Sequence, residues 1–409
     1  MEKFLSWMKE ALENSSSVFV NAALAKKELE GKADVLQTRD GSSLFAAIYP
    51  KKVSAPRFAI YAAHLDSPCL KIKPRPVTYS GGLALLETEV YGGAIDYSLF
   101  DRPLYLSGRV IGKDLRPRLI ESKEPFAYVP SLAIHYGRDV NSSFSVDPSL
   151  DLRAVISSSL PSAPFSFERY LLSLCPEAGE ILGFDLYLVV KEKAKSVGLN
   201  SEFCLSPRLD DLSGAYAGVY AFANSPRADE DLIKVLVLFS GEEIGSSIYS
   251  GAAGDLLSEG LKQVASDLGF DLAKALPRSC LCSSDAAHAG HPNKLSLEDQ
   301  CHPIRMGKGV ALKYSASSAY STSGLTGAYA KSICLDAGIP FQEYSIRSDL
   351  RSGSTLANIS NSQVSIPSFD IGVPLLSMHS AVESCAYLDL GWMELFASSF
   401  FSNLKPMGE

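Results

Sequence analysis

The stretch that decides the fold is Leu232-Ile233-Lys234-Val235-Leu236-Val237-Leu238-Phe239, followed by Ser240-Gly241-Glu242-Glu243-Ile244-Gly245. Its first half is almost wholly apolar, which is typical of a strand buried on both faces in a parallel sheet. The glycines then predict a turn, so the two carboxylates lie at the carboxyl end of the strand. Open α/β sheets bind their ligands at that edge. We therefore expect a functional site there, although an isolated Glu-Glu pair is more often a solvated turn.

Composition restricts the classes of function. The chain has 409 residues, 46% hydrophobic and 21% charged, which is ordinary for a globular protein and long enough for two domains. Its net charge of −8 argues against a nucleic-acid-binding surface. The sequence contains no run of about 18 apolar residues, so we predict no membrane span. The eight cysteines are scattered and the amino terminus lacks a signal-peptide core, which together predict a cytoplasmic protein with reduced thiols.

The pattern changes twice along the chain. Residues 57–63 form a second apolar strand, whereas from about residue 73 to 204 glycine pairs separate short β-like runs. We therefore predict an α/β fold with a mixed, largely parallel sheet flanked by helices, formed by residues 1–74 and 205–409. A β-rich domain, residues 75–204, is inserted into it.

Other segments have the periodicity of helices or strands. We expect helices over residues 3–30 with a break at 15–17, and over 210–223, 246–268 and 381–400. Further strands are expected at residues 33–37, 43–48, 278–284, 341–347 and 368–371.

Metal-binding side chains follow these predicted strands or precede the helices. They are His64, Asp66, Asp210, Glu242, Glu243, Asp285 and His379. Each has a simpler explanation alone: Asp210 could equally be an N-cap, and a lone histidine is more often structural. Gathered on one edge of a sheet, however, imidazoles and carboxylates suit zinc, or alternatively manganese or cobalt.

A site for two metal ions would use most of these groups. Two divalent ions about 3.5–4 Å apart can share one bridging carboxylate and one water. Asp210 suits the bridge. His64 and Asp285 would then complete one ion, and Glu243 and His379 the other.

Two carboxylates remain for other tasks. Asp66, two residues from His64, is expected to accept the second N–H of that imidazole. Glu242 is expected to act as the general base, taking a proton from the metal-activated water and passing it to a leaving amine. Such chemistry needs no nucleophilic serine or cysteine.

These stretches, in this order, resemble the aspartyl aminopeptidase family within the clan of paired-zinc exopeptidases. The matches span roughly residues 60 to 390 and are His64-Leu65-Asp66-Ser67-Pro68, Tyr91-Gly92-Gly93, Phe100-Asp101-Arg102, Ser206-Pro207-Arg208-Leu209-Asp210, Glu242-Glu243-Ile244-Gly245-Ser246, Asp285-Ala286-Ala287-His288-Ala289-Gly290-His291 and Met378-His379-Ser380. The resemblance implies that the inserted domain serves dimerisation and that dimers assemble into a tetrahedral dodecamer. It also implies two zinc ions per subunit and removal of N-terminal Asp or Glu from peptides.

The resemblance also supplies candidates for substrate binding. Lys313 matches the lysine thought to meet the acidic side chain of the substrate, a role that suits an ammonium group. Otherwise it would be a surface lysine on a strand edge. His288 and His291 match histidines near the site. Tyr97 stands where the family has a histidine thought to reach a neighbouring subunit's active site.

Departures from the family pattern keep the specificity open. Asp96-Tyr97-Ser98-Leu99 replaces a usual Trp-His-Thr-Trp, and Ala319 replaces a usual arginine, so two cations are lost. We therefore weigh three functions: an aminopeptidase for acidic N-terminal residues, the same chemistry on neutral residues, and a non-catalytic assembly or peptide-binding protein on the same scaffold.

Overall fold

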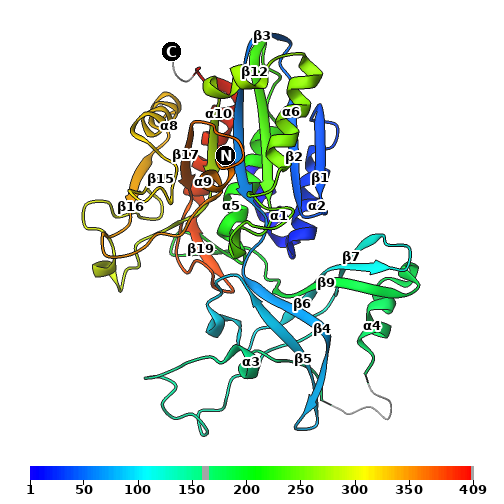
Figure 1. The fold of residues 1–409 in the computed structure, drawn as a ribbon. Coiled ribbons are helices and arrows are strands. Elements are labelled where there is room, and N and C mark those ends of the chain that lie inside the picture. Colours follow the sequence, from blue (N-terminus) through cyan, green and yellow to red (C-terminus); the bar gives the residue numbers. More distant parts are fainter. Residues whose placement is uncertain (159–164, 407–409) are drawn as a thin grey trace.

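The computed structural model describes residues 1–158 and 165–406. Figure 1 shows two parts, a sheet covered by helices above and a second, more open sheet below. Within the described residues, no helix is both long enough and apolar enough to cross a bilayer.

The upper part is built on an eight-stranded mixed sheet. Its strands, in spatial order, are β1 (Val35–Arg39), β2 (Ser43–Ile48), β12 (Glu230–Phe239), β3 (Lys52–His64), β13 (Cys280–Ser284), β17 (Ser368–Gly372), β15 (Val310–Tyr314) and β16 (Phe341–Ser345). The central strands β12, β3, β13 and β17 run parallel to one another. This confirms the predicted mixed, largely parallel sheet.

Successive side chains of the central strands point to opposite faces of the sheet and pack into two separate hydrophobic cores. Ala59, Tyr61 and Ala63 of β3 point into one core, whereas Phe58 and Ile60 point into the other. Because both faces are buried, β12 needs the nearly continuous apolar run seen in the sequence.

Helices cover both faces of this sheet. The first core contains residues of α1 (Glu2–Asn14), α2 (Val18–Leu29), α5 (Leu209–Ala223), α8 (Gly324–Ala337) and α10 (Tyr387–Asn403). The second contains residues of α6 (Leu256–Leu268), α7 (Leu272–Ala275) and α9 (Leu356–Ser360). Figure 1 shows α6 and α10 on opposite sides of the sheet.

Two predicted helices begin later than expected. Residues 246–255 form turns before α6, since Gly251 and Gly254 break the helical pattern. Strand β19 (Glu383–Ala386) precedes α10, in place of the helix start expected at residue 381. Helix α8, which we did not predict, begins at a capping box between Ser323 and Thr326.

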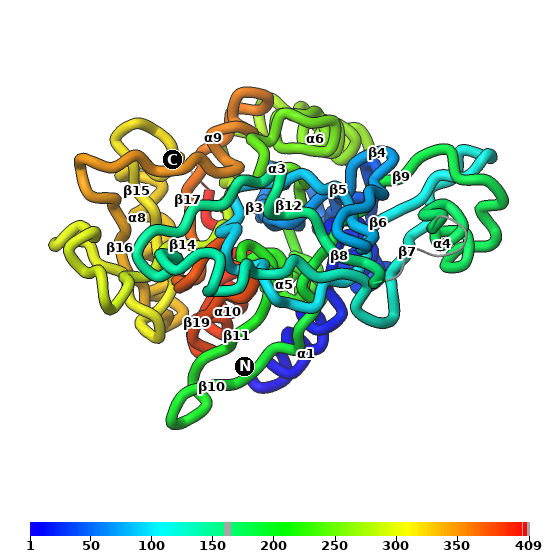
Figure 2. Tube along the Cα trace, turned by 90° about the horizontal axis from the view of Figure 1, so that it is seen from below, coloured from blue at the N-terminus to red at the C-terminus, as the bar shows by residue number. Residues whose placement is uncertain are grey.

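The lower part is a six-stranded sheet. Its order is β7 (Pro117–Glu121), β6 (Leu104–Gly112), β9 (Ile181–Val190), β4 (Cys69–Ser80), β5 (Leu83–Tyr91) and β8 (Ala154–Ser157). The short helices α3 (Pro148–Asp151) and α4 (Phe167–Leu174) belong to the same region. Figure 2, seen from below, shows the chain of this part in front of the upper part.

The remaining strands form two smaller sheets. β10 (Lys195–Val197), β11 (Phe203–Ser206) and β19 form a three-stranded sheet, and β14 (Ala287–His288) pairs with β18 (Pro374–Leu375). The domain limits at residues 75 and 204 stay a prediction.

Helix α5 packs unusually closely on the sheet, and Asp210 lies in its first turn. The Tyr61 hydroxyl donates a hydrogen bond to the Gly214 carbonyl at 2.9 Å. A methyl group on Gly218 would lie only 2.4 Å from the Tyr61 ring. The glycine therefore sets the distance between α5 and β3.

We predict that Gly218→Ala destabilises the protein because the added methyl group collides with Tyr61. Overpacking of this kind costs about 1–3 kcal/mol, set against roughly 1 kcal/mol that alanine gains in helix propensity. Thermal melting of the purified protein measures the effect. Gly324→Ala, where nothing lies within 4 Å, is the control and should not lower the melting temperature. Equal melting of both variants would contradict the packing argument.

Candidate metal centre

The predicted metal-binding residues meet at the carboxyl edge of the large sheet. His64 is the last residue of β3 and lies beside Phe239, the last residue of β12. Glu242 and Glu243 form a 3₁₀ turn directly after β12, and Asp285 directly follows β13. Parallel strands bring their carboxyl ends to one edge, so residues distant in sequence become neighbours here.

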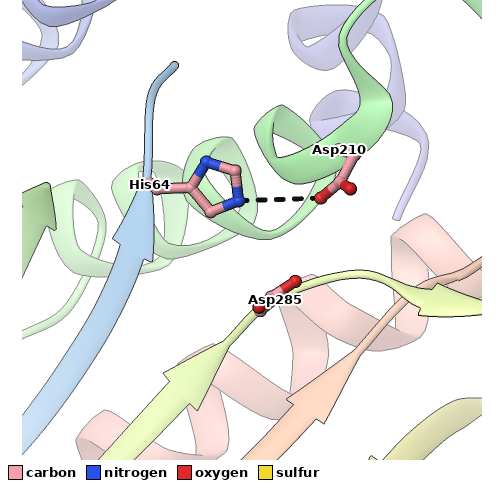
Figure 3. Close-up of side chains that lie close together, drawn as sticks. All are labelled: His64, Asp210 and Asp285. Carbon is pink, nitrogen blue, oxygen red and sulfur yellow. Dashed lines mark ion pairs between the residues drawn. The ribbon is translucent and has the colours of Figure 1, made fainter. Parts of the chain in front are cut away.

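The first cluster joins His64, Asp210 and Asp285. Each offers a ligand atom within 4.8 Å of the others. The Nε2 atom of His64 lies 3.6 Å from Oδ1 of Asp210. Figure 3 shows the three side chains, which come from β3, the start of α5 and the end of β13.

The second cluster joins Asp210, Glu243 and His379. Nε2 of His379 lies 3.3 Å from Oδ2 of Asp210 and 3.3 Å from Oε2 of Glu243. Asp210 thus belongs to both clusters and offers one oxygen to each, which is the geometry expected of a bridging ligand. Asp210 as a residue is 4% exposed.

The donor set fits divalent cations. Oδ1 of Asp210 and Oε1 of Glu243 are buried without a hydrogen-bond partner among the described residues, which is costly unless a cation binds there. Burial opposes protonation of His379, yet the Asp210 and Glu243 carboxylates raise its pKa to about 10. The carboxylates that hold this proton could hold a metal ion instead. Imidazole with carboxylate suits zinc.

Asp66 is buried behind the first cluster, and its contacts differ in detail from our expectation. Nδ1 of His64 lies 3.0 Å from the Asp66 backbone carbonyl but 3.6 Å from its carboxylate. The carboxylate instead accepts hydrogen bonds from the backbone N–H groups of Glu242 and Glu243, each at 3.2 Å, and from the Tyr91 hydroxyl at 2.9 Å. Asp66 therefore fixes the Glu242-Glu243 turn as well as the histidine.

Glu242 lies beside the clusters and belongs to a third grouping with His64 and Glu243. Burial, with the nearby Asp285 and Asp210 carboxylates, raises the pKa of Glu242 to about 8. A bound cation would favour the ionised form, which is the form that a general base needs.

Lys313 on β15 is inside the site, not on a surface edge. Its ammonium group is buried, donates a hydrogen bond to the Ala286 carbonyl at 2.7 Å and lies 3.4 Å from Oδ1 of Asp285. Burial opposes the charge, but the Asp285 carboxylate holds the pKa of Lys313 above its usual value. The Tyr320 ring lies 5.2 Å away.

The other predicted substrate-binding residues lie farther out. His288 and His291 line a cavity of about 300 Å³ together with Tyr344. Tyr97 is 65% exposed and lines a separate cavity of about 810 Å³ beside the six-stranded sheet. A single chain therefore does not bring Tyr97 into the metal centre.

Two buried acids were missed as site residues. Asp211 adjoins Asp210 and accepts the His64 backbone N–H at 3.4 Å; burial raises its pKa well above the usual range. Glu383 accepts the backbone N–H groups of Asp210 at 2.9 Å and His379 at 2.7 Å. The Asp-Asp pair and an acid four residues after His379 were the available signals.

Comparison with known proteins agrees with this geometry. Residues 15–401 match the family described as "Aminopeptidase I zinc metalloprotease (M18)". A relative from Clostridium acetobutylicum, named "Probable M18 family aminopeptidase 2", is 36% identical over 392 residues, covering 92% of this chain and 90% of the relative. A Pseudomonas entomophila protein of the same name is 35% identical over 348 residues, covering 83% and 80%.

Solved structures resemble the whole fold. The cryo-EM structure of the Ape4 and Nbr1 complex has a TM-score of 0.92 at 28% identity, covering 98% of this chain and 86% of that chain. The M18 aminopeptidase of Thermotoga maritima has a TM-score of 0.83 at 20% identity, covering 98% and 96%. Since the family match spans nearly the whole chain and the site carries a zinc-type donor set, the protein belongs to the M18 family of zinc metallo-aminopeptidases.

Proposed function

We propose that the protein holds two divalent cations and removes acidic N-terminal residues from peptides. His64, Asp210 and Asp285 would hold one cation, and Asp210, Glu243 and His379 the other. The observation that carries this assignment is Asp210, which presents one carboxylate oxygen to each histidine.

Glu242 acts as the general base in this proposal. Bound cations would supply Lewis acidity, polarising the scissile carbonyl and acidifying water. The Glu242 carboxylate takes a proton from the attacking water and later delivers it to the leaving amine. Asp66 holds the Glu242 backbone N–H at 3.2 Å, so the base keeps a fixed position beside the cations.

Lys313 supports the acidic specificity. Its ammonium group lies within ion-pairing distance of Asp285, and the residue is 2% exposed. In such surroundings an ammonium group attracts a carboxylate more strongly than it would in water. A substrate Asp or Glu side chain would therefore be favoured over a neutral one.

A neutral specificity is the second candidate, and the same ion pair favours it. If the Asp285 carboxylate already neutralises the ammonium group of Lys313, this group attracts a substrate carboxylate only weakly. Ala319, beside Tyr320, supplies no second cation. The family membership leaves no comparable support for a non-catalytic role.

Self-association is part of the proposal. One structural neighbour, at 21% identity, is described as the mApe1 dodecamer. We infer that this chain assembles as well, and that Tyr97, which is exposed in the single chain, faces a neighbouring subunit. The tetrahedral arrangement and the cytoplasmic location stay predictions from the sequence.

Metal removal is the first test. We predict that a chelator abolishes peptide hydrolysis and lowers the melting temperature, because the buried carboxylates then repel one another. A ligand at 100 times its Kd stabilises by about 2.7 kcal/mol, so zinc should restore both properties. Asp210→Asn is the control, whose melting temperature should no longer respond to zinc. Chelator-insensitive hydrolysis would contradict the proposal.

We predict that Glu242→Gln lowers kcat by roughly 10²–10⁴-fold because an amide cannot accept the proton. Zinc content, measured by elemental analysis, should remain that of the wild type. Glu10→Gln, on the exposed face of α1, is the matched control and should be fully active. A variant that loses zinc as well as activity would assign Glu242 to the metal ligands instead.

Specificity is tested with peptides that begin with Asp, Glu, Ala or Leu. We predict that Lys313→Met lowers kcat/KM for the Asp and Glu peptides by roughly 10²–10⁴-fold, with little change for the others. This factor corresponds to about 3–5 kcal/mol, the typical loss of a buried ion-pair partner. Lys308→Met, at an exposed position, is the control.

The panel also separates the two candidate specificities. If kcat/KM falls equally for all four peptides and the zinc content is reduced, Lys313 stabilises Asp285 and does not bind the substrate side chain. Release of Ala or Leu by the wild type, in place of Asp or Glu, would establish the neutral specificity.

A further inference from the structure

The segment from Tyr91 to Ser98 connects the six-stranded sheet with the metal centre. It begins at the last residue of β5 and ends within a short 3₁₀ helix, Asp96–Leu99. Although it belongs to the lower part of the molecule, its polar groups contact residues of the candidate metal site. We call it the 91–98 segment.

One set of contacts holds the loop that carries His379. The ring Nδ1 of His379 lies 3.0 Å from the Gly93 carbonyl, and the Ile95 N–H donates to the His379 carbonyl at 2.9 Å. The Ser98 hydroxyl accepts the N–H of Ala381 at 2.8 Å and donates to the Ile95 carbonyl at 2.6 Å. Ser98 thus ties the loop and the segment to each other.

His379 needs this support because its own backbone is unfavourable. Its φ is +66°, in the left-handed region, and its side chain is 31% exposed, so packing alone does not fix the ring. Strained residues persist only where several neighbours determine their conformation. A hydrogen bond to Nδ1 also sets the tautomer, leaving Nε2 free to face Asp210 and Glu243.

A second set of contacts reaches the other side of the site. The Tyr91 hydroxyl donates to Asp66 at 2.9 Å. At Gly92, with φ +76°, a Cβ atom would lie 3.0 Å from the Cβ of Glu243, so a larger residue would press on that side chain. The segment therefore lies against Glu243 and His379 of the second cluster and against Asp66, which supports the Glu242-Glu243 turn.

We propose that the 91–98 segment positions His379 for metal binding, and that Ser98 is the positioning residue on which this depends. The inference rests on the proposed role of His379 as a ligand. Ser98 touches neither the cations nor the substrate. It acts through the Ala381 N–H, two residues after the ligand, and through the Ile95 carbonyl within the segment.

The experiment compares Ser98→Ala, Ser98→Thr and Ser122→Ala in the full chain. Ser122 is a matched control, since its hydroxyl also accepts a backbone N–H, that of Leu106 at 3.0 Å, directly after β7 and away from the metal ligands. Zinc retention is measured by dialysis against graded chelator, and the absorption spectrum of the Co²⁺-loaded protein reports ligand geometry. The values of kcat and KM are measured with and without excess zinc.

We expect Ser98→Ala to bind one zinc equivalent about 10–100-fold more weakly, as loss of a hydrogen bond behind a ligand typically does. Its Co²⁺ spectrum should change, kcat should fall without excess zinc and recover with it, and KM should stay unchanged. Ser98→Thr keeps the hydroxyl and should match the wild type. Ser122→Ala should retain zinc normally.

A purely structural role predicts another pattern. If Ser98→Ala lowers the melting temperature but retains zinc and its Co²⁺ spectrum like Ser122→Ala, the positioning role is wrong. The zinc and cobalt measurements need no turnover. A wild type that binds zinc but hydrolyses no peptide would therefore refute the proposed function. The role of Ser98 would still be tested by the zinc-binding measurements.

Discussion

The structure depends on keeping several carboxylates together and largely out of water. Burial and mutual repulsion raise the pKa values of Asp211, Glu243 and Asp285, so the ionised cluster is unstable without cations nearby. The fold supplies part of the compensation through Lys313 and through the backbone N–H groups that point at Asp66. Divalent metal ions would supply the rest, which is why a site so acidic can exist on an ordinary α/β sheet.

Both parts of the molecule contribute residues to the candidate metal centre or to its support. The large sheet brings the ligands to one edge because its central strands are parallel, and β3, β12 and β13 end side by side. The six-stranded sheet contributes no proposed ligand. However, Tyr91 at the end of β5, and Gly93 just after it, contact site residues directly. The six-stranded sheet, whose strands lie between β3 and β12 in the chain, thus helps to support the candidate metal centre.

Much of this could be predicted from the sequence. The apolar run of β12 predicted the buried strand, and the acids after it predicted the edge of the sheet where the candidate ligands meet, because both signals lie in the local pattern. Helix α8 was missed because Gly324 and Gly327 weaken its helical signal. Glu383 was missed for a different reason: it supports Asp210 by bonding to its backbone, a contact between residues 173 apart that no local pattern encodes.

The order of the ligands along the chain has a consequence for the timing of activity. His64 and His379 lie far apart in the sequence, and Asp210 pairs with both only after the central strands and α5 have docked. Contacts between residues so distant in sequence form slowly, and a metal site of this kind does not exist in the unfolded chain. Metal loading would therefore be a late event in maturation. A partly folded molecule would have no hydrolytic activity, and neighbouring nascent peptides would be spared until the enzyme is complete.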